Sequence, residues 1–211
     1  MQMQTTITKL SQLDLKGTYS YADYLTWKFD EAVELIKGKI MLMCPAPSLN
    51  HQRLSRRLLH PIDSYLIGGT CEIFHAPFDV RFYDHKQSIC ANKDIFTVVQ
   101  PDLCVVCDPK KLDKRGCLGA PDWIIEILSK GNSKKEIQTK YALYQEKGVK
   151  EYWIVYPYER TIHQFVLHEE SQCYQLIKMY ADDDLLIPSV FPDLTIDLQT
   201  VFLNIGDEDS E

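Results

Sequence analysis

The chain has 211 residues, of which 45% are hydrophobic and 25% are charged, a balance typical of one folded globular domain. No apolar run approaches the roughly 18–20 residues that a membrane span requires. The formal net charge of −7 argues against a protein that coats nucleic acid through bulk electrostatic attraction, although it leaves room for a local basic groove. The seven cysteines are an odd number without framework spacing, and we expect no secretory signal, so reduced thiols in a cytoplasm are the expectation.

The first half of the chain predicts two helices and a series of short strands. Residues 19–28 are expected to be helical, with Ser20 as the capping residue. Residues 32–43 predict two strands that are joined by a tight turn at Gly38. A longer helix is predicted over 48–69, where leucines recur at helical spacing. Four short strands follow, at residues 71–76, 78–83, 96–100 and 102–108, with a surface loop between Phe82 and Phe96.

The second half predicts a strand, a helix and a parallel strand. Residues 122–129 carry apolar side chains on both faces, as in a sheet covered on both sides. Ser133 and Glu136 fit a capping box at the start of the next helix, and Gly148 fits its end. A second buried strand, at 151–157, would then run parallel to the first. An antiparallel pair at residues 161–170 and 173–181 and a strand with a helix at 191–202 complete the expected elements.

These elements predict an α/β fold with a mixed central β-sheet flanked by helices. We expect an N-terminal extension at residues 1–18, one domain at residues 19–203 and an acidic disordered tail at residues 204–211.

Three acidic residues stand inside apolar strands. Alternation places Glu126 on the same face as Ile124 and Leu128, where an isolated ionised carboxylate would be costly. Asp102 opens another apolar strand, and Glu34 is embedded in a third. For any one of them a structural role is favoured by about two to one over a functional one. Three acids that converge would repel each other, and a hard divalent cation would relieve that repulsion.

One lysine of the helix after residue 133 is expected to face these acids. Ile137, Tyr141 and Tyr144 form the apolar stripe of that helix, and Lys140 falls on the same side. The alternative is that Lys140 packs its aliphatic stem and extends its ammonium into water. With acids on the adjacent strand, we favour an ammonium directed at the site.

The order of these segments resembles a known family. An aspartate after proline (Asp102), Glu126 on the next long strand and a nearby lysine resemble the PD-(D/E)xK nuclease superfamily. The segments "VELIKGKI", "HAPFDVRF", "VVQPDLCVVCDP", "GAPDWIIEILS", "KYALYQEKGVKEYWIV" and "DLTIDL" resemble more closely the Uma-two (Uma2) family of bacterial restriction endonuclease-like proteins. The resemblance spans roughly residues 19 to 203 and implies a restriction endonuclease-like fold.

The resemblance also implies a metal site. It assigns Asp102, Glu126 and the backbone carbonyl of Ile127 as ligands of Mg²⁺ or Mn²⁺, and it matches Glu34 with a further acid of the site. Leu128 stands where the superfamily's simplest pattern has its lysine. In the Uma2 pattern that lysine lies on the following helix, at the position of Lys140.

The function implied is metal-dependent endonucleolytic hydrolysis of phosphodiester bonds in nucleic acid, with DNA as the expected substrate. The alternative is a catalytically inert nuclease fold that binds nucleic acid or a protein partner. A third hypothesis is that the same site acts on a small phosphoester or a nucleotide. Analogy with other nucleases allows a homodimer.

Several weaker signals were open to two interpretations. Arg53, Arg56 and Arg57 form either a face that meets phosphates or an ordinary solvated helix surface. His51 either belongs to the helix start or approaches the site, and we favour the first. Cys104 is three residues from a second cysteine in a strand, so the two sulfurs should face opposite sides and should not share a zinc ion.

Overall fold

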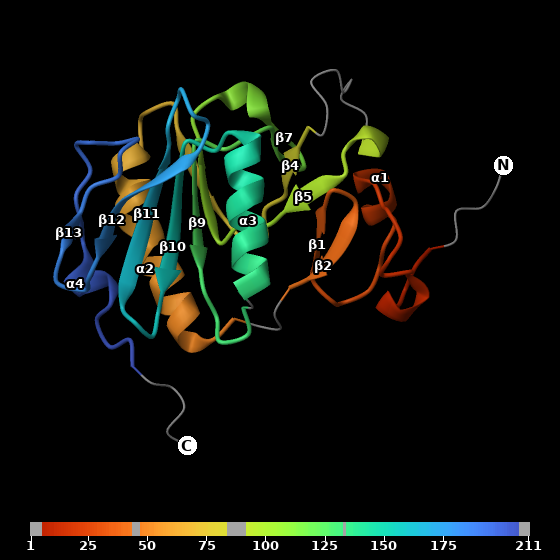
Figure 1. The fold of residues 1–211 in the computed structure, drawn as a ribbon, viewed down its shortest axis with the longest axis horizontal. Coiled ribbons are helices and arrows are strands. Elements are labelled where there is room, and N and C mark those ends of the chain that lie inside the picture. Colours follow the sequence, from red (N-terminus) through yellow and green to blue (C-terminus); the bar gives the residue numbers. More distant parts are fainter. Residues whose placement is uncertain (1–5, 44–46, 84–91, 133, 207–211) are drawn as a thin grey trace.

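A computed structural model describes residues 6–43, 47–83, 92–132 and 134–206 of the chain, and Figure 1 shows its fold. Its helices are α1 (Tyr21–Tyr24), α2 (Leu49–Leu66), α3 (Lys134–Lys147) and α4 (Leu198–Val201), with short 3-10 turns η1 (Leu10–Gln12), η2 (Asn92–Asp94) and η3 (Pro109–Lys111). Its strands are β1 (Val33–Ile36), β2 (Lys39–Leu42), β3 (Glu72–His75), β4 (Val80–Phe82), β5 (Thr97–Val99), β6 (Leu103–Val106), β7 (Leu112–Asp113), β8 (Gly116–Leu118), β9 (Trp123–Ile127), β10 (Glu151–Tyr156), β11 (Thr161–Leu167), β12 (Tyr174–Tyr180), β13 (Leu185–Leu186) and β14 (Ile196–Asp197).

In the described part of the chain, the strands form two mixed six-stranded sheets rather than one central sheet, and β13 and β14 form a separate antiparallel pair. The first has the order β12-β11-β10-β9-β6-β3, and the second has the order β2-β1-β5-β4-β8-β7. The predicted parallel crossover is confirmed. The strands β9 and β10, which precede and follow α3 along the chain, pair with each other in parallel. The chain passes from the second sheet to the first between β5 and β6, and Asp102 lies in that link. The α/β class is confirmed, and the division into two sheets is the finding that the sequence did not indicate.

Helices cover both faces of the first sheet, as Figure 1 shows for α2 and α3. On one face, leucines of α2 such as Leu54 and Leu58 pack against Ile125. On the other face, Leu143 and Tyr144 of α3 pack in one cluster with side chains of the sheet. This two-sided burial explains the continuous apolar character of β9 and β10. None of the helices in the described part of the chain is long and apolar enough to cross a membrane.

Local signals at the ends of elements are largely confirmed. Ser20 caps α1 by accepting a hydrogen bond from the Asp23 amide. Gly38 has a positive φ of 77° in the β1–β2 turn, and Gly148 has a φ of 80° after α3, conformations that favour glycine. The expected cap at Ser133, most of the expected loop after Phe82 and most of the acidic tail lie outside the described residues.

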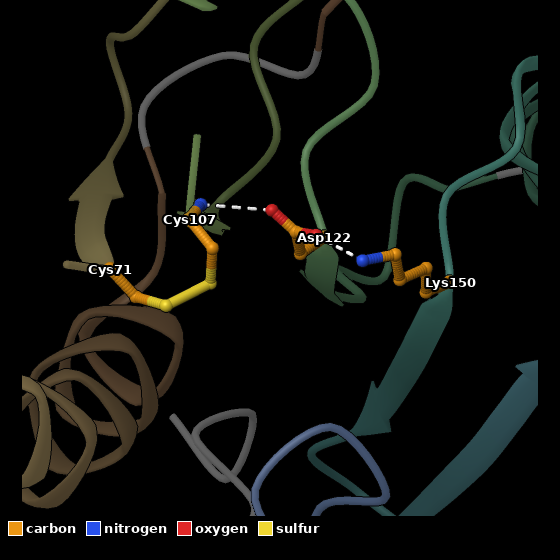
Figure 2. Close-up of a disulfide and its surroundings, with 4 residues drawn as sticks. All are labelled: Cys71, Cys107, Asp122 and Lys150. Atoms are coloured by element: carbon orange, nitrogen blue, oxygen red, sulfur yellow. Dashed lines mark hydrogen bonds and ion pairs between the residues drawn. A yellow bond between two sulfur atoms is a disulfide. The ribbon is translucent and has the colours of Figure 1, made fainter. Parts of the chain in front are cut away.

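A disulfide joins Cys71 and Cys107, which corrects the expectation of reduced thiols for these two residues. Glu72 of β3 pairs with Val106 of β6, so the next residues along, Cys71 and Cys107, lie opposite each other. Spacing in the sequence does not reveal this long-range pairing. Figure 2 shows that the Cys107 amide donates a hydrogen bond to Asp122, which also pairs with Lys150. Cys104 packs on the α3 side of the sheet and Cys107 on the α2 side, as the alternation predicted.

Candidate active site

The four predicted catalytic residues lie around one cavity of about 410 Å³. Glu34 comes from β1, Asp102 from the link between the two sheets, Glu126 from β9 and Lys140 from α3. They are separated by up to 106 positions along the chain, and the packing of α3 on the first sheet and the junction of the two sheets bring them together. Ile127 also lines this cavity.

Lys140 connects two of the three acids. Its Nζ lies 2.9 Å from Oε1 of Glu126 and 3.1 Å from Oε1 of Glu34. Burial by itself would lower the pKa of Lys140, but the negative charges of Glu126 and Glu34 outweigh burial and raise it, so the side chain is an ammonium ion. A lysine carried by α3 therefore does reach the acids on the sheets.

Glu126 is enclosed by α3. Tyr144 donates a hydrogen bond of 2.6 Å to the same Oε1 atom that Lys140 contacts. Burial raises the pKa of Glu126 to about 7; the Lys140 charge opposes that rise, and the charges of Asp102 and Glu34 add to it. Tyr144 was assigned only to the apolar stripe, but its hydroxyl makes it part of the site. Its spacing of four residues from Lys140 was the available signal.

Glu34 has one satisfied oxygen and one unsatisfied oxygen. The backbone amide of Gln100 donates a hydrogen bond of 2.8 Å to Oε1, which Lys140 also contacts. Oε2 is buried and has no hydrogen-bond partner among the described residues. A buried carboxylate oxygen without a donor is costly, which is compatible with a further cation or water at this point.

Asp102 is held from two sides. The Ile127 amide donates a hydrogen bond of 2.7 Å to Oδ2, and Nε2 of His51 lies 3.1 Å from Oδ1. Burial would lower the pKa of His51, but the Asp102 carboxylate, with Glu126 and the Ile127 carbonyl, raises it instead. His51 belongs to the first turn of α2, and its side chain also reaches the site, so both interpretations from the sequence apply.

The donor chemistry of the cavity fits a magnesium-type ion. Mg²⁺ in proteins is usually bound by one or two carboxylates and retains several waters. Asp102 and Glu126 would supply the carboxylates, and the family resemblance adds the carbonyl of Ile127. Four acids and a single lysine line the cavity among the described residues. No group of three or more His, Cys, Asp or Glu side chains in the described part of the chain is arranged as a complete metal cluster.

Two of the three arginines of α2 hold the C-terminal segment. Arg53 donates a hydrogen bond to the carbonyl of Asn204, and Arg57 donates to the carbonyls of Val201 and Leu203. These bonds satisfy carbonyls at the end of α4 and hold the C-terminal segment against α2. The sequence did not indicate this role of Arg53 and Arg57, whereas Arg56 is exposed.

The sequence pattern of the Uma2 family, described as "Putative restriction endonuclease", matches residues 21–199. The chain belongs to the Uma2 family. A crystal structure described as that of a "putative nuclease belonging to DUF820" from Anabaena variabilis ATCC 29413 superimposes with a TM-score of 0.64 and 21% sequence identity. The match covers 87% of this Uma2 chain and 97% of that chain, and at this identity it establishes a shared fold. A comparison with the curated proteins finds no match.

Proposed function

We propose that this Uma2 protein is a metal-dependent endonuclease that hydrolyses phosphodiester bonds in nucleic acid, with DNA as the expected substrate. The observation that carries the proposal is that Lys140 bridges Glu126 and Glu34 in the cavity that Asp102 also faces. An acid–acid–lysine set in one cavity supplies the charges that phosphoryl transfer needs.

Asp102, Glu126 and the Ile127 carbonyl would hold Mg²⁺ or Mn²⁺. When bound, such an ion supplies Lewis-acid polarisation of the phosphate and makes an attacking water more acidic. Burial of Glu126 in the α3 side of the sheet excludes bulk water from that carboxylate, which strengthens its electrostatic interactions. Asp102 keeps its orientation because its two oxygens are bonded to different elements.

Lys140 would act on the water or on the phosphate. An ammonium group has three donors; one bonds to Glu126, and Glu34 lies 3.1 Å away as an ion pair. A remaining donor would orient the attacking water or stabilise the charge that develops on the phosphate oxygens. Glu34 keeps Lys140 charged and, through its unsatisfied Oε2, would accept a hydrogen bond from a water in the cavity.

The proposal is tested by incubating the purified protein with supercoiled plasmid, single-stranded DNA and RNA in the presence of Mg²⁺, Mn²⁺ or a chelator. Asp102→Asn and Glu126→Gln preserve side-chain shape and should each lower cleavage on the order of 10³-fold or more, since each removes a charge from the reacting centre. Glu170→Gln, which changes an exposed acid in the turn after β11, should cleave as the wild type does.

Cleavage that persists in folded Asp102→Asn or Glu126→Gln protein, or that survives chelation, would contradict the proposal. A wild-type protein that cleaves nothing under these conditions would favour the inert nucleic-acid- or protein-binding module, a reading that the net charge of −7 supports. Parallel assays with model phosphoesters separate an endonuclease from an enzyme that acts on small phosphoesters.

A further inference from the structure

The orientation of Asp102 depends on two donors from different elements. The Ile127 amide on β9 occupies Oδ2, and the His51 imidazole on α2 lies against Oδ1. The two donors together fix the plane of the carboxylate, which otherwise could rotate about its terminal torsion with little resistance. Glu126 has a different arrangement, because Lys140 and Tyr144 both bond to one of its oxygens.

His51 is itself held in place. Its backbone amide donates a hydrogen bond to the side chain of Ser48, the cap of α2. The imidazole is only 13% exposed, and Leu54 in the next turn is completely buried against the first sheet. A side chain anchored in this way can impose a geometry on Asp102 rather than follow it.

We propose that His51 is a positioning residue that holds Asp102 in the orientation needed to bind a divalent cation. This inference rests on the proposed function. A carboxylate offers about four acceptor sites, so Oδ1 can keep the bond from His51 while it faces a cation in the cavity. Residues that orient metal ligands in this manner typically change the metal affinity about 10–100-fold when they are replaced.

The test is a titration of the full chain with Mn²⁺, followed by calorimetry and by electron paramagnetic resonance of the bound ion. Three substitutions of His51 separate its roles. His51→Leu removes the donor, and His51→Asn keeps an amide that is too short to reach the position of Nε2. His51→Gln places an amide nitrogen close to that position.

We expect His51→Leu and His51→Asn to bind Mn²⁺ about 10–100-fold more weakly than the wild type, and His51→Gln to recover most of the loss. Because the defect lies in cation affinity, cleavage by the weak variants should rise towards the wild-type value as Mn²⁺ is increased. His60→Gln, an exposed histidine at the other end of α2, should bind Mn²⁺ normally.

Wild-type Mn²⁺ affinity in His51→Asn, or equal weakening in the Asn and Gln variants, would overturn the inference; this pair decides the matter even if His51→Leu does not fold. The proposed function fails in a different way, namely when Asp102→Asn and Glu126→Gln bind Mn²⁺ as tightly as the wild type. Weak binding in those two variants together with wild-type binding in His51→Asn would refute the role of His51 alone.

Discussion

Two glutamates on neighbouring strands of the first sheet, Glu126 on β9 and Glu151 on β10, are both buried, and their surroundings differ. Glu151 accepts hydrogen bonds from the Trp153 indole and the Gln164 amide at Oε1, and from the Val190 backbone amide at Oε2. All of these donors are neutral, and both oxygens are satisfied. They tie β10 and β11 to the segment before β14.

Glu126 has its protein donors on one oxygen, and its side chain lines the cavity. Its charged neighbours are two further acids and one ammonium, so the acids of this group outnumber the ammonium. Burial raises the pKa of both glutamates, to about 7 for Glu126. Burial of an acid therefore does not separate a structural carboxylate from a functional one. The two kinds of carboxylate differ in the charge of their partners and in whether both oxygens have a hydrogen-bond donor.

The largest effect on stability is expected from Lys140→Met, which removes the ammonium beside Glu126 and Glu34. Glu126 and Glu34 then remain buried without their cation, and the loss in the free energy of unfolding should reach about 3–5 kcal/mol where Glu126 is ionised. The Lys140 charge lowers the pKa of Glu126, so its removal should raise that pKa above about 7. Because a raised pKa of an acid means that protonation favours the folded state, the stability of the variant is present at low pH and is lost as the pH rises through about 7 and beyond. Denaturant unfolding below and above this pH measures the difference.

The control for that experiment is Lys135→Met, which changes an exposed lysine of the same helix. It should leave stability nearly unchanged at both pH values. A destabilisation by Lys140→Met that stays constant or shrinks as the pH rises would contradict the assigned electrostatics.

Glu151→Ala tests the structural half of the comparison. It leaves the Trp153 indole and the Val190 amide without an acceptor and removes one acceptor of the Gln164 amide, and we expect a loss of about 3 kcal/mol in the free energy of unfolding. Cleavage per folded molecule should not change, because Glu151 does not line the cavity. Denaturant unfolding and plasmid cleavage on the same preparation check both statements, with the exposed Glu159→Ala as the matched control. Loss of cleavage without loss of stability would reverse the assignment.

Tyr144→Phe is expected to have the smallest effect. It removes one hydrogen bond to Glu126, worth about 1.5 kcal/mol at the lower end of the range for a bond to a charged group, while the Lys140 contact remains. Because the Tyr144 hydroxyl lowers the pKa of Glu126, that pKa should rise above about 7 in the variant, as NMR titration of the carboxyl carbon would detect. Tyr141→Phe loses only a long contact to the Tyr174 carbonyl and should leave the Glu126 titration unchanged.

Local patterns accounted for much of the site before the fold was known. Alternation along 122–129 placed Glu126 on the face opposite Ile125, and that is its position in β9. Helical periodicity placed Lys140 on the inward side of α3, where it contacts two acids. Both predictions hold because they depend on the repeat of one element, 2 residues in a strand and about 3.6 in a helix.

Other features depend on which elements meet, and no local repeat encodes that. Glu151 also stands in an apolar strand, and nothing in its neighbouring sequence distinguishes it from Glu126. Its donors come from β11 and from residue 190. The contact of His51 with Asp102 requires the start of α2 to reach the link between the sheets, and the disulfide requires the register of β3 on β6. The sequence by itself determined the elements and the faces on which the acids and the lysine lie, since backbone geometry sets these within a few residues. Only the tertiary structure decided which acid is closed off by neutral donors and which shares a cavity with Lys140, because long-range packing selects the partners of a buried charge.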